Sequence, residues 1–442
     1  MRLALPLVIL CLLPGLAAAA TREVAPGPGR LAAAIAAAQP GDVLHLAPGR
    51  HDGPVTLDKP LTLEGRGQAE LDGHGQGSVI TITGPETVVR GLTILGSGSS
   101  HETIDSGIQI KKGGDRALIE GNRLTGNLFG IDVHGGIDVQ VRGNHIEGRR
   151  DRRMNDRGNG VYVWTSPGLV VDGNVIDGGR DGILVTIGRK LTFTNNRFTN
   201  LRFAVHYMYA HDSTISGNVS IGNGLGYALM YSERLQVHDN ISLGDRAHGL
   251  MFNYTNSSDV TGNLVRGSEK CVFVYNSHRN ILANNRFEGC DIGIHFTAGS
   301  ERNGITGNAF VGNRNQVKYV GTRDVEWSVE GRGNYWSDHP AFDLNGDGIA
   351  DSPFRPNDLM DHVLWSQPAA ALLVGAPVVQ LVRWSQSNFP ATLPGGVVDS
   401  FPLVTAPLIA ARPEDEAALA AHQAARAAQG QNDDEFDPLT AH

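Results

Sequence analysis

The chain repeats one short phrase, which reads ISGNVSI at residues 215–221, VHDNISL at 237–243 and VTGNLVR at 260–266. The Asn at the centre of the phrase recurs at Asn122, Asn144, Asn174, Asn196, Asn218, Asn240, Asn263, Asn285, Asn308 and Asn334. Successive spacings are 22, 30, 22, 22, 22, 23, 22, 23 and 26 residues, and an apolar residue stands three places before each of the first nine. A period this regular is typical of a solenoid, in which each repeat stacks only on its neighbours.

A second pattern places two apolar residues two positions apart within each repeat. The pairs are Ile131 and Val133, Val161 and Val163, Ile183 and Val185, Val205 and Tyr207, Tyr227 and Leu229, Leu250 and Phe252, Val272 and Val274, and Ile294 and Phe296. A period of two indicates β-strands, and about 22 residues cannot hold a pair of helices. We therefore predict an all-β fold, a right-handed parallel β-helix of the pectin-lyase-like kind, with apolar ladders inside and Asn at a tight bend.

The rest of the chain divides around this solenoid. The expected division is a signal peptide over 1–20, an N-terminal cap over 21–60, the β-helix over 61–336, a calcium-like loop and partner-docking segment over 337–411, and a helical and disordered tail over 412–442. The first segment has the basic start, apolar run and small residues of a secretory leader, so we expect export. The cap contains an Ala-rich helix predicted from Arg30 to Gln39.

Charge and composition exclude two broad classes of protein. The 442 residues carry a net charge of −9, or −10 without the Arg2 of the leader, which argues against general binding to nucleic acid. No apolar stretch of about 20 residues is flanked as a membrane span, so we do not expect an integral membrane protein. Beyond the leader the chain has two cysteines, Cys271 and Cys290, and the sequence leaves their pairing open.

Two insertions interrupt the period, and both precede the same strand of the repeat. They cover Ser97 to Ser106 and Arg149 to Arg157, so we expect them to project side by side from one face. The second insertion is cationic, and its Arg149, Arg150, Arg152 and Arg153 are predicted to bind carboxylates of a partner. A solvated loop is the alternative.

The residues between and just after the inward pairs are expected to face outward on one parallel sheet. They are Asp132 and His134, Tyr162 and Trp164, Leu184 and Thr186, His206 and Met208, Ala228 and Met230, Met251 and Asn253, Phe273 and Tyr275, and His295 and Thr297. Thioether and imidazole groups suit Cu(I). One hypothesis is a transient Cu(I) site drawn from His206, Met208, Met230, Met251, His134 and His295. The competing hypothesis is a soft, adaptable surface that docks a partner.

A second candidate metal site follows the solenoid. Asp343, Asn345, Asp347 and Asp351 place oxygen atoms at positions 1, 3, 5 and 9 of a loop that turns at Gly346, as calcium loops do. Position 12 holds a Phe where such a loop needs Glu. We therefore predict a truncated, structural Ca²⁺ loop, with an ordinary metal-free turn as the alternative.

No catalytic residues are predicted. Glycoside hydrolysis needs two carboxylates that flank the bond, and the adjacent pair Asp433-Asp434 lies outside the solenoid. The other candidate carboxylates are scattered over the coils and are expected to be solvated turn residues. They are Asp132, Asp177, Asp181 and Asp212.

The end of the solenoid and the segment after it resemble one family. The matching stretches are Gly333-Asn334-Tyr335-Trp336-Ser337-Asp338, Asp351 to Asn357, Val378 to Trp384, Phe389-Pro390 and Asp399 to Leu403. They look like NosD, the periplasmic maturation protein for nitrous oxide reductase, and the segment from Val378 to Leu403 makes the resemblance specific.

The resemblance implies a periplasmic, non-enzymatic partner of an ABC transporter, made of a permease and an ATPase, that helps assemble the copper centres of the reductase. A copper chaperone and the reductase itself would be further partners, and the membrane would be reached only through the permease. Within the C-terminal segment, Val378, Trp384 and Phe389 are predicted to contact a partner. A carbohydrate-binding or polysaccharide-cleaving β-helix protein and a purely adhesive solenoid remain alternatives.

Overall fold

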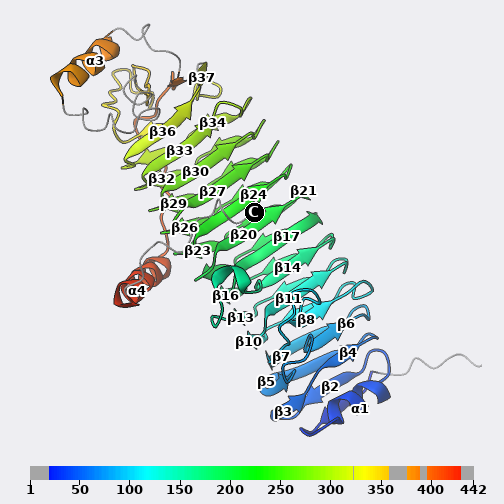
Figure 1. Ribbon diagram of the computed structural model, residues 1–442. Coiled ribbons are helices and arrows are strands. Elements are labelled where there is room, and N and C mark those ends of the chain that lie inside the picture. The colour runs from blue at the N-terminus through cyan, green and yellow to red at the C-terminus, as the bar shows by residue number, and fades with distance from the viewer. Residues whose placement is uncertain (1–18, 322, 358–375, 389–395, 430–442) are drawn as a thin grey trace, which may run out of the picture.

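The protein is an all-β, right-handed parallel β-solenoid of about 14 turns, with about 22 residues in each coil. The computed structural model describes residues 19–321, 323–357, 376–388 and 396–429. Figure 1 shows the coils stacked along one axis, with helices at both ends and one helix on the flank. The predicted fold class is therefore confirmed.

One parallel sheet carries the longer strands, and successive coils add to it in order. Its strands are β4 (Val55–Leu57), β6 (Ile80–Ile82), β8 (Ser106–Ile110), β11 (Phe129–His134), β14 (Val161–Trp164), β17 (Asp181–Arg189), β20 (Phe203–Met208), β24 (Leu225–Met230), β27 (His248–Asn253), β30 (Lys270–Tyr275), β33 (Ile292–Thr297) and β36 (Asn315–Val320), with β21 (Ala210–His211) beside β17.

The second sheet is built mainly of short strands in two rows, which turn the chain at the bend between them. Its strands are β1 (Thr21–Val24), β2 (Val43–Leu46), β3 (Gly49–Asp52), β5 (Thr62–Asp72), β7 (Val88–Leu95), β9 (Leu118–Glu120), β10 (Arg123–Thr125), β12 (Gln140–Arg142), β13 (His145–Glu147), β15 (Val170–Asp172), β16 (Val175–Asp177), β18 (Thr192–Thr194), β19 (Arg197–Thr199), β22 (Thr214–Ser216), β23 (Val219–Ile221), β25 (Gln236–His238), β26 (Ile241–Leu243), β28 (Asp259–Thr261), β29 (Leu264–Arg266), β31 (Ile281–Ala283), β32 (Arg286–Glu288), β34 (Gly304–Thr306), β35 (Ala309–Val311) and β38 (Tyr335–Trp336).

Both predicted ladders are present inside the solenoid. All sixteen residues of the inward pairs are buried, with at most 2% of their surface exposed. The repeated Asn residues are buried at the bend, where the amide of each one before Asn334 donates to the Asn of the next coil; Asn196 Nδ2 to Asn218 Oδ1 is 2.9 Å, and Asn218 Nδ2 to Asn240 Oδ1 is 3.0 Å. The same side chains accept backbone N–H groups, so the ladder satisfies polar groups that the bend would otherwise bury unpaired.

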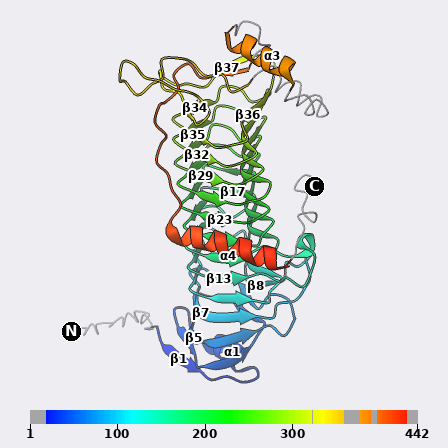
Figure 2. The same ribbon diagram turned by 90° about the vertical axis from the view of Figure 1, so that its left-hand side faces the viewer.

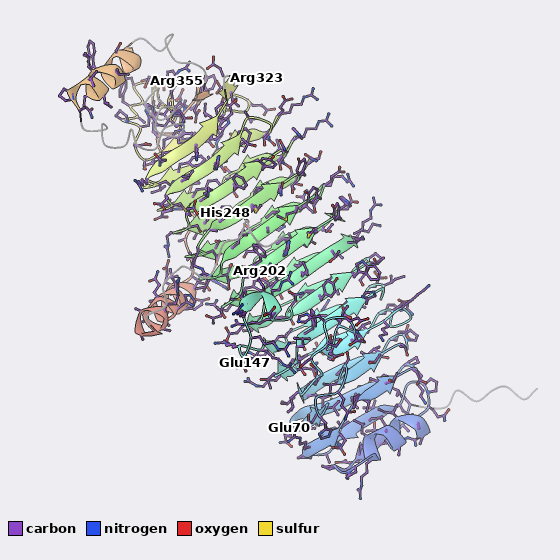
Figure 3. All side chains as sticks on the ribbon, viewed as in Figure 1. Glu70, Glu147, Arg202, His248, Arg323 and Arg355 are labelled. Carbon is purple, nitrogen blue, oxygen red and sulfur yellow. A yellow bond between two sulfur atoms is a disulfide. The ribbon has the colours of Figure 1, made fainter. Side chains whose placement is uncertain are left out.

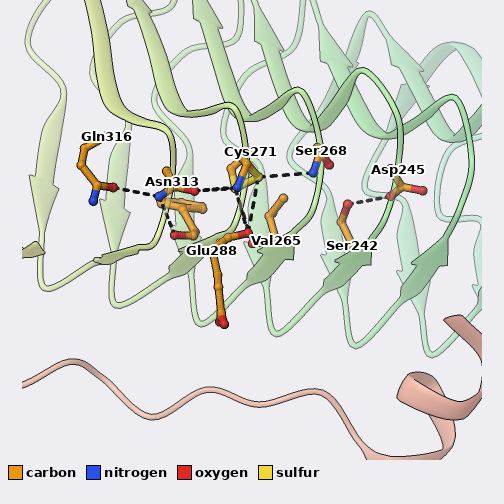
Figure 4. Close-up of a disulfide and its surroundings, with 10 residues drawn as sticks. Ser242, Asp245, Val265, Ser268, Cys271, Glu288, Asn313 and Gln316 are labelled. Carbon is orange, nitrogen blue, oxygen red and sulfur yellow. Dashed lines mark hydrogen bonds between the residues drawn. A yellow bond between two sulfur atoms is a disulfide. The ribbon is translucent and has the colours of Figure 1, made fainter. Parts of the chain in front are cut away.

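The two cysteines form a disulfide between neighbouring coils, which settles the pairing that the sequence left open. Cys271 occupies a position that Gly249 holds in the preceding coil, just before an inward residue. A Cβ on Gly249 would lie 2.1 Å from Val265 Cγ1, so this corner admits almost no side chain. Cys271 and Cys290 are both buried there, and Figure 4 shows the surroundings of the disulfide at Cys271.

The two ends of the solenoid are closed differently. At the N-terminus, helix α1 (Arg30–Ala37) covers the first coil, while β1, β2 and β4 already pair with the two sheets, so the sheets begin before residue 61. At the other end, Trp327 and Trp336 are fully buried and stack with Phe310. Asp399 accepts a hydrogen bond from Trp336 Nε1 at 2.8 Å and ties the following segment to the last coil.

Strand β37 (Asp324–Glu326), between β36 and β38, pairs with β39 (Gly396–Val398) of the segment after the solenoid, and that segment also contains helix α3 (Pro377–Asn388) and helix α4 (Pro413–Gln429). The chain before helix α4 returns along the solenoid, and α4 itself lies across the coils beside β23, as Figure 2 shows. None of the described helices is both long enough and apolar enough to cross a lipid bilayer. The predicted signal peptide up to residue 18 and the predicted disordered end from residue 430 lie outside the described residues.

Candidate functional site

The outer side of the long-stranded sheet carries the side chains predicted to face outward. We call the outward residues of β20, β24 and β27 the His/Met face; they are Phe203, His206, Met208, Leu225, Ala228, Met230, His248, Met251 and Asn253. Strand register aligns Met208 with Met230, and it aligns His206 with Ala228 and Ala228 with Met251. Adjacent strands lie about 4.8 Å apart. His206, Met230 and Met251 therefore surround Ala228, the smallest side chain of the face.

This face is largely closed to solvent. Phe203, Leu225, Ala228, Met230 and Met251 form one apolar cluster, against which Met208 and Phe273 pack. Met230 is 5% exposed and Met251 is 7% exposed. The sequence predicted the direction of these side chains but not their burial.

A buried carboxylate orients His206. Asp181 Oδ2 accepts a hydrogen bond from His206 Nδ1 at 3.2 Å, and Asp181 also accepts two from Arg202, at 2.8 and 2.7 Å. Burial opposes ionisation of Asp181, but the hydrogen bonds from His206 and Arg202 outweigh it and hold the pKa of Asp181 below its ordinary value. Among the described residues none hydrogen-bonds His206 Nε2, which is the nitrogen left for a ligand.

This arrangement corrects the expectation that the scattered carboxylates are solvated. Asp181 is fully buried because it neutralises Arg202, whose guanidinium lies 4.5 Å from the ring of Phe203. Asp132 is also fully buried, with a 3.1 Å hydrogen bond from Gln109, and burial raises the pKa of Asp132 to about 7. Asp177 and Asp212 remain partly exposed, each paired with Arg side chains.

The other two predicted copper ligands lie away from this cluster. His134 is on β11, three strands before His206, and its ring packs against Trp164 with the two rings tilted by 53° and their centroids 4.0 Å apart. His295 is on β33 beyond Phe273, and burial lowers the pKa of His295 to about 4. Burial likewise lowers the pKa of His248 to about 4. Within the described ranges, no three His, Cys, Asp or Glu residues group so that they could hold a metal ion.

A stack of tyrosines borders the His/Met face, and the sequence analysis missed it. Tyr209, Tyr231 and Tyr254 follow the last outward residue of their strands, and their rings stack with centroids 5.1 and 5.2 Å apart. All three are exposed and have positive φ angles of 49–53°. Their spacings of 22 and 23 residues are the signal that could have revealed them.

The calcium-like loop is held by its own backbone. Both carboxylate oxygens of Asp343 accept N–H groups, from Gly346 at 2.6 Å and from Gly348 at 2.8 Å, and these bonds lower the pKa of Asp343. Asn345 donates to Asp347 at 2.9 Å, and Asp351 accepts the N–H of Leu344 at 2.8 Å. The four predicted residues therefore come together, in contacts that an exposed turn also makes. Binding of Ca²⁺ stays a prediction.

The two insertions do pack against each other. Arg149 donates to Ser97 O at 2.8 Å and to Ser99 Oγ at 2.7 Å, and His101 Nε2 lies 3.0 Å from Asp156 O. Arg150 pairs with Asp177. Arg149 and Arg150 thus contact other parts of the same chain, whereas Arg152 is partly exposed and Arg153 is exposed.

Helix α3 presents an apolar surface at the C-terminal end. Val378, Leu381 and Trp384 are all exposed, while Val379 on the opposite side is buried. Two predicted partner-contact residues, Val378 and Trp384, therefore lie on one exposed helix. The third, Phe389, lies outside the described residues.

Comparison with known proteins identifies the family. Residues 142–341 match the sequence profile of a family described as "Periplasmic copper-binding protein (NosD)", and residues 78–179 match one described as "Right handed beta helix region". A probable ABC transporter binding protein NosD from Stutzerimonas stutzeri is 38% identical over 82% of this chain and 86% of its own length. The chain belongs to the NosD family. A NosD protein of the same description from Pseudomonas aeruginosa is 39% identical over 83% of this chain and 89% of its own length.

Solved structures support the fold of this NosD chain but not a particular function. The surface adhesin PfbA of Streptococcus pneumoniae aligns with a TM-score of 0.53 at 12% identity, covering 66% of this chain and 94% of its own. An alginate lyase aligns with a TM-score of 0.50 at 13% identity, covering 72% of this chain and 92% of its own. An adhesin and an enzyme share the solenoid, so the fold does not decide the function.

Proposed function

We propose that this chain is a periplasmic, non-enzymatic accessory protein that works with an ABC transporter in assembling the copper centres of nitrous oxide reductase. The NosD relatives carry the name of an ABC transporter binding protein, and the family description is that of a periplasmic copper-binding protein. Copper is then the cargo of the protein and not a resident cofactor.

The observation that carries the copper part of the proposal is the pairing of Asp181 with His206 beside Met208 and Met230. A metal-binding His commonly donates its second ring N–H to a carboxylate, which fixes the tautomer and orients the other nitrogen toward the metal. Thioether sulfur and imidazole nitrogen are ligands that suit soft Cu(I). We assign His206 Nε2, Met208, Met230 and Met251 as the Cu(I) ligand set, and we leave out the distant His134 and His295.

We propose that helix α3 is the part of this chain that binds the transporter permease. An exposed apolar helix face at the end of a soluble protein is typical of a surface that a partner covers. Val378, Leu381 and Trp384 provide this face. Arg152 and Arg153 of the cationic insertion are assigned to the reductase or the copper chaperone, because arginine pairs well with carboxylates at interfaces.

The test expresses the full-length protein with Val378, Leu381 and Trp384 each replaced by Ser. The matched control changes two other exposed apolar residues, Leu344 and Leu408, to Ser. We expect the first variant to be secreted and folded, to lose co-purification with the permease and to leave the reductase without its full copper content, while the control behaves like the parent. Copper-replete reductase together with intact co-purification in the first variant would refute the proposal.

A further inference from the structure

A groove runs along one edge of the long-stranded sheet, at the turns that follow β24, β27, β30 and β33. Its volume is about 520 Å³, and each of these turns lines it with two consecutive residues: Glu233 and Arg234, Asn256 and Ser257, His278 and Arg279, and Glu301 and Arg302. Figure 3 labels Arg202 and His248 where β20 and β27 begin, so the groove lies at the opposite edge of the sheet from them.

The middle of the groove offers hydrogen-bond donors. Asn256 Oδ1 accepts the N–H of His278 at 2.8 Å, which leaves the amide NH₂ of Asn256 as the group that can still bind a ligand. His278 Nδ1 accepts the N–H of Glu301 at 3.1 Å, so the imidazole carries its proton on Nε2 and donates there. Among the described residues neither of these two nitrogens has a hydrogen-bond partner, so the groove is suited to a ligand rich in acceptor oxygens.

The groove also carries an excess of positive charge. Its two carboxylates are already paired, Glu233 with Arg234 at 2.6 Å and Glu301 with Arg323 at 3.2 Å. Arg279 and Arg302 are exposed, and within the part of the chain that the structure describes no carboxylate pairs with either of them. Two such charges on a protein with a net charge of −9 favour an anionic ligand, since a guanidinium binds carboxylates well.

The turn itself does not require arginine. Arg234, Arg279 and Arg302 have φ angles of 55°, 57° and 60°, in the left-handed region that side chains disfavour. Gly168 makes the same turn in an earlier coil, with a φ of 74°, and its N–H likewise donates to the next coil. Glycine adopts this conformation without strain, and strained residues cluster at functional sites. The strain therefore favours a binding role for these arginines over a purely structural one.

The tyrosine stack beside the groove indicates what kind of ligand fits. Tyr231 and Tyr254 each precede a residue pair of the groove by one residue, and their rings stack at 5.2 Å with an angle of 7° between them. Tyr209 continues the stack on the other side of Tyr231. The ring faces are turned toward each other, so the exposed surface consists of ring edges and hydroxyl groups. A sugar ring has little open aromatic face to pack on here, whereas tyrosine of this kind is common where proteins contact each other.

We propose that this groove binds an acidic, extended segment of a partner protein, with two of its carboxylates on Arg279 and Arg302. Acceptor oxygens of the segment would meet Asn256 and His278, and an apolar side chain would lie against the tyrosine stack. Four adjacent coils span about 14 Å, which is the length of about four extended residues. The groove is separate from helix α3 and from the cationic insertion, and binding there does not depend on the copper role proposed above.

The test measures binding of a synthetic peptide to the full-length protein by fluorescence anisotropy, without added copper. The peptide is a blocked, dye-labelled hexapeptide of alternating glutamate and leucine. The parent is compared with the double variant Arg279→Gln and Arg302→Gln. The matched control is Arg142→Gln with Arg314→Gln, two other exposed arginines for which no described carboxylate forms an ion pair.

We expect the double variant to bind the peptide at least about tenfold more weakly and to keep the melting temperature of the parent, while the control binds like the parent. Binding to the parent should weaken as salt is added, because the contacts are between exposed charges. Replacing Tyr231 and Tyr254 by Ser should also weaken binding, and it should do so less for a peptide in which serine replaces leucine.

No binding by the parent, or equal affinity in the parent and the double variant, would overturn the proposal. A trigalacturonate carries the same three carboxylates as the peptide, and tighter binding of this sugar than of the peptide would make the groove a glycan site instead. Full displacement of the peptide by an equal concentration of inorganic phosphate would reduce it to a site for small anions.

If the double variant is less stable than the parent, crosslinking on the unaltered parent decides. A peptide that carries a photo-crosslinker in place of one leucine should label residues 254–257 and 276–279. Labelling confined to other surfaces refutes the proposal.

Discussion

Replacing Asp181 by Asn exchanges one carboxylate oxygen of the candidate site for an NH₂ group, and we expect two separate effects. Asn keeps the size of Asp and one acceptor oxygen but removes the negative charge. Arg202 is then left buried, with a charge that no described carboxylate other than Asp181 neutralises. Removing one member of a buried ion pair lowers the free energy of unfolding by about 3–5 kcal/mol. Because the Asn amide oxygen can still accept a hydrogen bond from Arg202, we expect a loss of about 3 kcal/mol for this variant.

The assay is chemical denaturation of the parent, Asp181→Asn and a matched control, Asp177→Asn. Asp177 lies four residues away and accepts hydrogen bonds from Thr199 and Asn200, but it is partly exposed, so its loss should cost less than about 1 kcal/mol. The double variant Asp181→Asn with Arg202→Met should recover most of the lost stability, because it removes the uncompensated charge. Equal losses in the two single variants, or a double variant as unstable as Asp181→Asn, would refute the reasoning.

The second effect of Asp181→Asn is on copper. His206 loses the carboxylate that holds its Nδ1–H, so Cu(I) affinity should fall about 10- to 100-fold even where the fold is intact. The direction in which stability changes with pH also follows from Asp181. Because the pKa of Asp181 is lowered, its stabilisation is present above the ordinary carboxylate pKa and is lost as the pH falls below it.

Three further predictions concern the fold. The pKa of Asp132 is raised to about 7, so the parent should lose stability as the pH rises from about 4 to 7, and Asp132→Asn should flatten this dependence in thermal melts, whereas parallel curves would contradict it. Asn218→Ala leaves buried N–H groups of the ladder unpaired and should cost about 2–3 kcal/mol in denaturation, against almost nothing for Asn155→Ala in the exposed insertion. Replacing Cys271 and Cys290 by Ala should cost up to about 3 kcal/mol, and added reductant should then no longer lower the melting temperature of the variant.

The repetitive part of the fold could be predicted because every coil must meet the same packing and hydrogen-bonding requirements. Each repeat must bury its apolar pair and pair the polar groups of its bend, so the period shows both ladders directly. The contact of the two insertions was also predictable, since both precede strands that stack in register.

The parts that could not be predicted depend on contacts outside the repeat. Arg197 and Asp415 pair across 218 residues, and no period connects α4 with the coil it covers. The burial of Asp181 was missed because an Asp beside Gly reads as a turn residue. Its position 21 residues before Arg202 would have placed the two on adjacent coils. The copper hypothesis also named His134 and His295, although the order of the coils places them three and four strands away from His206.

The most direct test of the account is a Cu(I) titration of the purified chain under anaerobic conditions. Met208, Met230 and Met251 are replaced together by Leu, which keeps volume and apolar character but removes the sulfurs, and Met154→Leu is the matched control. We predict that the triple variant keeps the melting temperature of the parent and binds Cu(I) at least about tenfold more weakly, a loss of about 1.4 kcal/mol, while the control binds like the parent. Equal Cu(I) affinity in the triple variant and the parent would contradict the account and leave the face as a docking surface alone.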